Sequence, residues 1–191
     1  MAARVVGLTG GIGSGKSEAL AAFGRHGAAT FSSDEAVRLL YHRGGVRAAV
    51  AEHFGPGVVR EDGSIDRARV AERVFADPAE RGWLEALLLP LLAAEFEAWR
   101  DRAVGSGANL LVHEAPTLFE AGIQDRYDTI VTVTAPRELR EQRRPGSADR
   151  MASQLPEEAK AARSDVVYEN TGTLDDLDRF VADLVRRLET G

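Results

Sequence analysis

Short apolar runs alternate along the chain with longer segments in which apolar residues recur every three or four positions. The short runs predict buried strands and lie at residues 5–8, 28–31, 110–112, 129–134 and 166–168. The longer segments predict helices and lie at residues 18–23, from a cap at 32–34 to 41, and at 46–53, 67–75, 78–102, 136–142 and 175–188. Alternating strands and helices favour an α/β fold with a mainly parallel sheet that helices cover on both faces.

Two of the expected helical regions shape the rest of the fold. The last helix is amphipathic and places on one face Leu177, Phe180, Val181, Leu184, Val185 and Leu188. Residues 46–102 are helical in pattern almost throughout, with an expected break at Pro90, and are long enough to form a lobe outside the sheet. We therefore expect a single domain over residues 1–191, with its core at about 1–45 and 103–191, the helical lobe at about 46–102 and a lid at about 143–157.

The composition is typical of a globular protein, with 44% hydrophobic residues, 28% charged residues and no cysteine. The longest apolar run, at residues 87–94, is too short to span a bilayer. The residues before the first glycines lack the apolar stretch of a secretory signal, so we expect a cytoplasmic protein, monomeric or weakly self-associating. A net charge of −6 argues against broad nucleic-acid binding, and any phosphate-bearing ligand must be held locally.

A glycine-rich loop between the first expected strand and helix carries the strongest chemical pattern. Residues 10–17, GGIGSGKS, match G-x-x-x-x-G-K-[ST] at every fixed position. Glycines let successive backbone N–H groups point at phosphate oxygens, and the following helix adds its positive end. The pattern predicts binding of a nucleotide triphosphate, with Lys16 beside the β and γ phosphates and the Ser17 hydroxyl on Mg²⁺. The residues expected to bind the nucleotide are Gly11, Ile12, Gly13, Ser14, Gly15, Lys16 and Ser17.

Other charged residues lie where a kinase needs them, and each has a plainer alternative. Asp34 follows the second strand and is a candidate base for an acceptor hydroxyl, or a helix cap. Glu114 follows the third strand and either holds Mg²⁺ through water or has a structural role. Arg143, Arg144 and Arg150 form a candidate lid over phosphoryl oxygens, or a solvated charged loop. The four histidines show no metal-ligand spacing and are expected on the surface or in the core.

From end to end the chain resembles the dephospho-coenzyme A kinase family. The resemblance is carried by GLTGGIGSGKS at 7–17, SSDEAVR at 32–38, HFGPGVVREDGSIDRARVAERVFADPAERGWLEALLLPLL at 53–92, EAPTLFEAG at 114–122 and QLPEEAKAARSDVVYENTG at 154–172. It implies phosphorylation of the ribose 3′-hydroxyl of dephospho-CoA by ATP, with Mg²⁺, in the last step of coenzyme A synthesis. It also implies a P-loop, adenylate-kinase-like core of five parallel strands, a helical domain for the acceptor, and a short lid.

The same resemblance assigns residues. The base of the family maps onto Asp34 and its ATP loop onto residues 13–18, which adds Glu18 to the nucleotide site. Among the lid arginines we choose Arg143 over Arg144 as catalytic.

The chain departs from the family pattern at several places. Ser32 and Ser33 replace the usual Asp-Ala before Asp34, Leu89 replaces the usual His before Pro90, and the lid is several residues short. Two alternatives therefore stay open: another P-loop kinase acting on a small molecule or a nucleoside monophosphate, and a nucleotide-binding regulator without transfer activity.

Overall fold

The computed structural model describes residues 3–146 and 154–190. The chain divides into two compact units. One unit consists of Met1–Ser33 and Arg100–Gly191, and the other of Asp34–Trp99. Below, the first is called the sheet unit and the second the helical unit, and each is described by itself.

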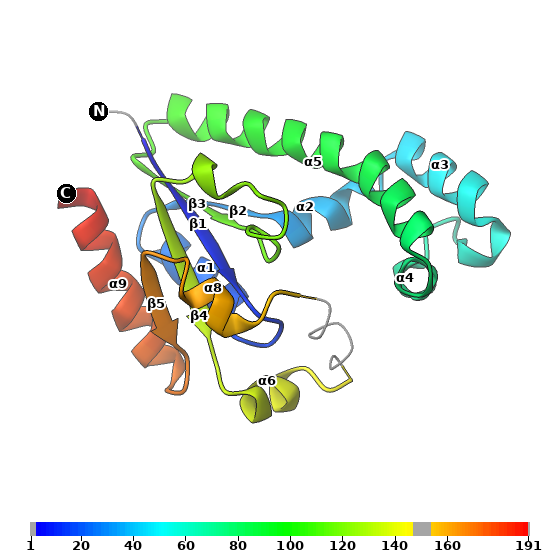
Figure 1. The fold of residues 1–191 in the computed structure, drawn as a ribbon. Coiled ribbons are helices and arrows are strands. Elements are labelled where there is room, and N and C mark those ends of the chain that lie inside the picture. Colours follow the sequence, from blue (N-terminus) through cyan, green and yellow to red (C-terminus); the bar gives the residue numbers. More distant parts are fainter. Residues whose placement is uncertain (1–2, 147–153, 191) are drawn as a thin grey trace. The chain divides into compact units, whose positions relative to one another are not determined.

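The sheet unit is built on five parallel strands (Figure 1). They are β1 (Arg4–Gly10), β2 (Ala29–Ser32), β3 (Leu110–Glu114), β4 (Thr129–Thr134) and β5 (Val166–Glu169), in the order β2-β3-β1-β4-β5. The register sets Leu8 beside Glu114 on one side and Val131 on the other. The expected α/β fold with a five-stranded parallel sheet is confirmed.

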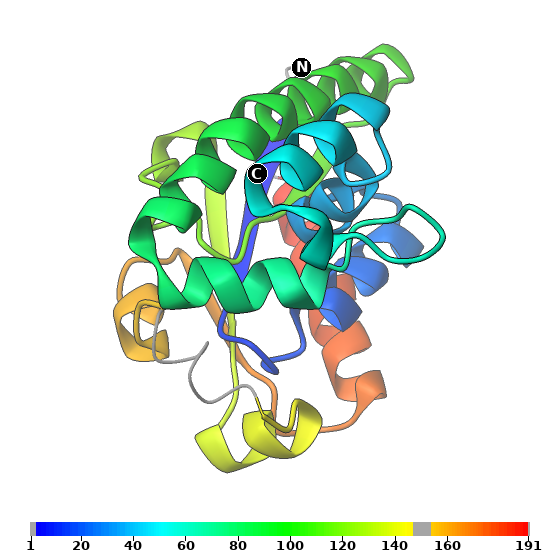
Figure 2. The same ribbon diagram turned by 90° about the vertical axis from the view of Figure 1, so that its right-hand side faces the viewer.

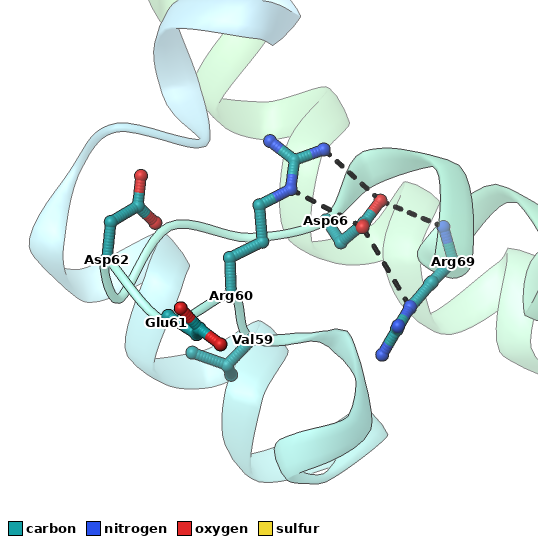
Figure 3. A pocket seen from close by; sticks show the side chains of 6 residues that line it. All are labelled: Val59, Arg60, Glu61, Asp62, Asp66 and Arg69. Atoms are coloured by element: carbon teal, nitrogen blue, oxygen red, sulfur yellow. Dashed lines mark hydrogen bonds and ion pairs between the residues drawn. The ribbon is translucent and has the colours of Figure 1, made fainter.

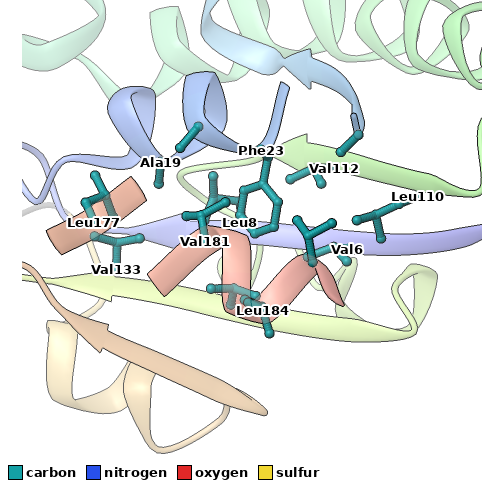
Figure 4. Close-up of a cluster of buried hydrophobic side chains, with 14 residues drawn as sticks. Val6, Leu8, Ala19, Phe23, Leu110, Val112, Val133, Leu177, Val181 and Leu184 are labelled. Carbon is teal, nitrogen blue, oxygen red and sulfur yellow. The ribbon is translucent and has the colours of Figure 1, made fainter. Parts of the chain in front are cut away.

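Helices cover both faces of this sheet. Helices α1 (Lys16–Arg25) and α9 (Leu174–Thr190) pack on one face, where Phe23 lies among β-strand valines and leucines and the apolar side of α9 (Figure 4). Of the α9 residues expected on that side, four are buried and Phe180 and Leu188 are partly buried against them. Ile130 points to the opposite face and joins a separate cluster with Leu118 and Phe119, because alternate strand residues face opposite ways.

The other elements that lie wholly within the described residues of the sheet unit are short. They are η2 (Gln124–Arg126), α6 (Arg137–Arg143) and α8 (Glu157–Ala161). Our sequence analysis did not predict α8.

The helical unit has its own core. It contains α3 (Gly44–Phe54), η1 (Pro56–Val58), α4 (Arg67–Ala76), most of α2 (Ser33–Leu40) and most of α5 (Pro78–Gly105). Val50, Phe54, Val70 and Leu88 are buried together at its centre. The Asp66 carboxylate caps α4 by accepting hydrogen bonds from the backbone N–H groups of the second and third helical residues, at 3.1 and 3.3 Å.

The expected break at Pro90 is wrong. Helix α5 has 28 residues and continues through Pro90. It is drawn as one uninterrupted helix in Figure 1, and Figure 2 shows the same ribbon turned by 90°. Proline removes one backbone hydrogen bond from a helix, here the bond to the carbonyl of Ala86. Apolar side chains on either side of Pro90 pack into one cluster, including Leu87, Leu88 and Leu91, and this burial offsets the lost bond. Among the helices of residues 3–146 and 154–190, α5 included, none is long and apolar enough to cross a membrane.

Candidate active site

The glycine-rich loop turns the chain from the end of β1 into the start of α1. Three of its glycines have positive φ angles, 144° at Gly10, 80° at Gly13 and 103° at Gly15. The space around them is as restrictive as the backbone. A Cβ atom on Gly10 would lie 2.1 Å from the Val133 carbonyl oxygen, and one on Gly15 would lie 2.1 Å from the Asn170 Nδ2 atom. The loop therefore needs glycine at these positions for its shape and for its close packing.

Lys16 lies inside the turn of this loop. Its Nζ atom donates a 2.8 Å hydrogen bond to the Gly11 carbonyl oxygen, and only 8% of the residue is exposed. The cation is thus held next to the loop backbone at the N-terminal end of α1. That arrangement suits the binding of phosphate oxygens, which would meet the ammonium group, the backbone N–H groups and the positive end of the helix together.

Ser14, Ser17 and Glu18 differ in exposure. Ser17 and Glu18 are exposed in the first turn of α1, so the Ser17 hydroxyl is accessible to a metal ion bound with phosphates. The Ser14 hydroxyl is buried and has no hydrogen-bond partner among the residues the structure describes. No group of three His, Asp or Glu side chains that could hold a metal ion by itself occurs in the described part of the chain. These residues fit Mg²⁺ only as an ion shared with nucleotide phosphates.

Glu114 is buried at the C-terminal end of β3. It is 3% exposed, and its Oε2 atom accepts a 2.7 Å hydrogen bond from the Ser32 hydroxyl on the neighbouring strand β2. Ser32 stands where the family commonly has aspartate, so this chain replaces a like charge beside Glu114 with a hydrogen-bond donor.

His113, next to Glu114, is buried and links two partly buried hydroxyl groups. Its Nε2 atom lies 2.8 Å from the Ser33 hydroxyl and its Nδ1 atom 2.8 Å from the Tyr127 hydroxyl. A neutral imidazole has one donor and one acceptor nitrogen, and so matches one hydroxyl on each side. Burial lowers the pKa of His113 from 6.5 to about 4, with a smaller contribution from the charge of Arg126. Burial also raises the pKa of the Tyr127 hydroxyl.

Asp34, the candidate base, is the second residue of α2 and is exposed. Helix α2 begins at Ser33, so Asp34 lies in its first turn rather than at a cap before it. A carboxylate in that position is stabilised by the helix dipole and remains accessible to a ligand. Asp34 belongs to the helical unit, and Ser33 before it to the sheet unit.

The candidate lid arginines are described in part. Arg143, the last residue of α6, directs Nη1 to the carbonyl oxygens of Gly13 and Ser14, both at 3.4 Å, and Nη2 to the Asn170 carbonyl oxygen at 3.1 Å. Arg144 follows as the C-cap of α6. Arg150, and residues 147–153 of the expected lid, lie outside the described residues. The structure thus brings Arg143 together with the glycine-rich loop.

Three residues near the loop were missed by sequence reasoning. Asn170 donates a 2.8 Å hydrogen bond to the Ser14 carbonyl oxygen, and Glu157 accepts one from the Gly11 N–H at 3.0 Å. Arg140 lies 3.4 Å from Glu157. The Pro-Glu-Glu sequence at 156–158 could have indicated the start of a helix, but nothing local indicates that its carboxylate reaches the loop.

Both lysines of the chain are buried. Lys16 is in the loop, and Lys160 is fully enclosed, with Nζ 2.6 Å from the Pro116 carbonyl oxygen and 2.9 Å from the Glu120 carboxylate. Lys160 therefore holds α8 to the segment after β3 and has a structural role.

The helical unit contains a pocket of about 530 Å³, and none of the residues that line it belongs to the glycine-rich loop. It is lined by Val59, Arg60, Glu61, Asp62, Asp66 and Arg69 (Figure 3). Arg60 and Arg69 both pair with Asp66, at 3.3 and 3.9 Å. The Arg60 guanidinium holds the pKa of Asp66 below its usual value. These arginines support the cap of α4.

Comparisons with known proteins agree with this geometry. Residues 4–176 match the family model described as dephospho-CoA kinase. The dephospho-CoA kinase of Frankia casuarinae is 39% identical over 188 residues, which cover 94% of this chain and 81% of that protein. A crystal structure from Thermus thermophilus superposes with a TM-score of 0.83 at 32% identity, covering 98% of this chain and 99% of that one. The dephospho-CoA kinase from Campylobacter jejuni shares the fold, with a TM-score of 0.72 at 20% identity over 98% of each chain.

Proposed function

The chain belongs to the dephospho-CoA kinase family, and from that membership we propose that it transfers the γ-phosphoryl group of ATP to the ribose 3′-hydroxyl of dephospho-CoA. The products are coenzyme A and ADP. The observation that carries the proposal is the complete phosphate-binding loop between β1 and α1, within a family match that spans residues 4–176.

The loop would bind the triphosphate of ATP. Backbone N–H groups of the loop other than that of Gly11, together with the start of α1, would face the anion, and Lys16 would exchange its hydrogen bond to the Gly11 carbonyl for the β and γ phosphates. Placing this charge beside the transferring group stabilises the transition state more than the ground state, which is the condition for a faster reaction. Residues 11–18 form the proposed nucleotide site.

Ser17 would hold Mg²⁺ through its hydroxyl, with phosphate oxygens and water completing the coordination. Bound there, Mg²⁺ would neutralise charge on the β and γ phosphates. Glu114, the buried last residue of β3, accepts a hydrogen bond from the Ser32 hydroxyl, which fixes the orientation of its carboxylate.

Asp34 would accept the proton of the acceptor hydroxyl. Its exposure and its place in the first turn of α2 support this role, because a general base must be reachable by the substrate. The helical unit, which includes most of residues 46–102, would receive the rest of the acceptor.

Arg143 would act at the phosphates as part of a lid at about 143–157. This role requires its guanidinium to leave the three carbonyl oxygens that it contacts. A hydrogen-bonded guanidinium that exchanges partners on nucleotide binding is consistent with a lid arginine.

A comparison of the rates with different acceptors tests the function. We expect ADP release in the presence of ATP, Mg²⁺ and dephospho-CoA to be far faster than with adenosine, AMP, CMP or shikimate. The non-reacting tail of dephospho-CoA supplies binding energy that aligns the hydroxyl for in-line transfer. ³¹P NMR of the product should place the new phosphate on the 3′-oxygen.

Two results would contradict the proposal. Equal use of AMP, or a phosphate on the 5′ side, would indicate a nucleoside monophosphate kinase. ATP binding without transfer to any of these acceptors would indicate a nucleotide-binding regulator.

A further inference from the structure

A buried carboxylate accepts a hydrogen bond from the phosphate-binding loop itself. Glu157 is 8% exposed, its Oε1 atom accepts the Gly11 N–H at 3.0 Å, and its Oε2 atom accepts the Ala135 N–H at 3.2 Å. Gly11 is the second residue of the loop, and Ala135 directly follows β4. One side chain on α8 therefore ties the loop to the end of the neighbouring strand through two charge-assisted hydrogen bonds.

Arg140 of α6 accompanies this carboxylate. Its Nε atom lies 3.4 Å from Glu157 Oε2 and donates a 3.0 Å hydrogen bond to the Ala135 carbonyl oxygen. The side chains of Arg140 and Glu157 are 16% and 8% exposed. Both side chains pack closely against the loop, because a Cβ atom on Gly11 would lie 2.4 Å from Glu157 Oε1 and 2.8 Å from Arg140 Nη1.

A carboxylate in this place creates an electrostatic problem. The loop is proposed to bind a polyphosphate anion, and a buried negative charge on the same loop repels that anion with little screening by solvent. The guanidinium of Arg140 cancels the charge at the point where it arises. Removing one member of a buried pair leaves the other uncompensated, which costs more than removing both.

We propose that Glu157 is a positioning residue that holds Gly11 and the first turn of the phosphate-binding loop, and that Arg140 neutralises Glu157 so that nucleotide can bind. The inference rests on the proposed function only in requiring a nucleotide polyphosphate as the ligand of the loop. The identity of the acceptor does not enter it.

The proposal predicts different effects on nucleotide affinity when each of the two residues is replaced. Arg140→Gln should leave Glu157 charged and unpaired, and raise the dissociation constants of ATP and ADP on the order of 10-fold or more. Arg140→Lys keeps a positive charge but not the guanidinium geometry, so it should bind ADP more tightly than Arg140→Gln. Glu157→Gln removes the repulsion, so it should loosen the loop and lower kcat while leaving nucleotide affinity within about 3-fold.

The double variant Arg140→Gln/Glu157→Gln provides the decisive measurement. It should bind ADP more tightly than Arg140→Gln alone, because the unpaired carboxylate is gone. If the two side chains acted only through their separate hydrogen bonds, without charge, the two single losses would add and the double variant would not recover. Isothermal titration calorimetry with ADP measures this directly.

The chain offers a matched control on the same helix. Arg137 and Glu141 form an exposed pair on α6, at 2.7 Å with side chains 71% and 43% exposed. Replacing both by Gln removes the same charges from the solvent side and should leave ADP affinity unchanged. The dissociation constants are compared only after circular dichroism shows a folded protein.

The outcomes separate this inference from the proposed function. If the wild type binds ADP but phosphorylates an acceptor other than dephospho-CoA, the pair can still be tested in full. If Arg140→Gln binds ADP as tightly as the wild type, or if Arg140→Lys fails equally, the role of Arg140 is refuted. If the double variant does not recover affinity relative to Arg140→Gln, the assignment of repulsion to Glu157 is refuted.

Discussion

Acid should destabilise the sheet unit through His113. This imidazole is buried between the hydroxyls of Ser33 and Tyr127, and its pKa is lowered from 6.5 to about 4, chiefly by burial. Between these values the unfolded chain binds a proton at His113 and the folded chain does not. The contribution of the neutral imidazole to the free energy of unfolding is therefore complete above pH 6.5 and is lost as the pH falls toward 4.

The size of the effect follows from the difference between the two pKa values. The difference of about 2.5 between the two pKa values corresponds to at most about 3.5 kcal/mol, at about 1.4 kcal/mol per pH unit, and about 3 kcal/mol of this is lost by pH 4, where half of the folded molecules are protonated at His113. That is a large part of the about 5–15 kcal/mol by which a domain is usually stable.

The assay compares the wild type with His113→Leu. Urea denaturation is followed by far-UV circular dichroism at about pH 7 and about pH 4. Tryptophan fluorescence would not report on the sheet unit, because the two tryptophans, Trp83 and Trp99, both lie in the helical unit. The variant should be less stable at neutral pH by about 1–3 kcal/mol, since it leaves two hydroxyls without partners. Its deficit should shrink or reverse by about 3 kcal/mol at the lower pH, because it has no buried imidazole to protonate.

A control uses another histidine. His42 is exposed, and His42→Gln should leave the pH dependence of stability as in the wild type. If the wild type and His113→Leu lose stability in parallel between pH 7 and 4, the buried neutral imidazole is not the cause and the reasoning is refuted.

Three further substitutions test the proposed site. Lys16→Ala should lower kcat by two or more orders of magnitude with dephospho-CoA, because the charge beside the transferring phosphoryl group is lost; near-normal turnover in a folded variant would remove Lys16 from the mechanism. Asp34→Asn should lower kcat roughly 10²-fold and leave the melting temperature nearly unchanged, since it keeps a polar group in the first turn of α2; full activity would exclude a general base at this position. Gly15→Ala should lower both the melting temperature and ATP affinity, because the new Cβ would lie 2.1 Å from Asn170 Nδ2 at a φ of 103°; a differential scanning fluorimetry curve matching the wild type would show that the loop tolerates a side chain there.

Local patterns were sufficient to predict several elements. The first strand, the glycine-rich loop and α1 follow one another within about 20 residues, and each is encoded by its own residues: an apolar run, glycines with Lys16, and helix formers. Helix α9 was predicted because its apolar face repeats with helical period over four turns. In these cases the residues within each segment are sufficient to specify its local structure.

Other features depend on distant residues and could not be predicted locally. Pro90 breaks a helix by local rules, but apolar packing on both sides keeps α5 continuous. Glu157 lies 146 positions from Gly11, and only the folded sheet unit brings them together. His113 carried no metal-ligand pattern, and its contacts with Ser33 and Tyr127 depend on the order of the strands. The sequence pattern could indicate parallel strands, but not which strands are neighbours.

The burial of Lys16 and Lys160 has a consequence for chemical modification. These are the only lysines of the chain, so none of its lysine amines is exposed, and the exposed positive charge is carried by arginine. Acyl thioesters, succinimidyl esters and other electrophiles that attack amines therefore meet a surface without lysine targets. Guanidinium groups stay protonated and do not compete as nucleophiles. Acylation at Lys16 would require its Nζ atom to leave the Gly11 carbonyl, so nucleotide that occupies the loop should protect it.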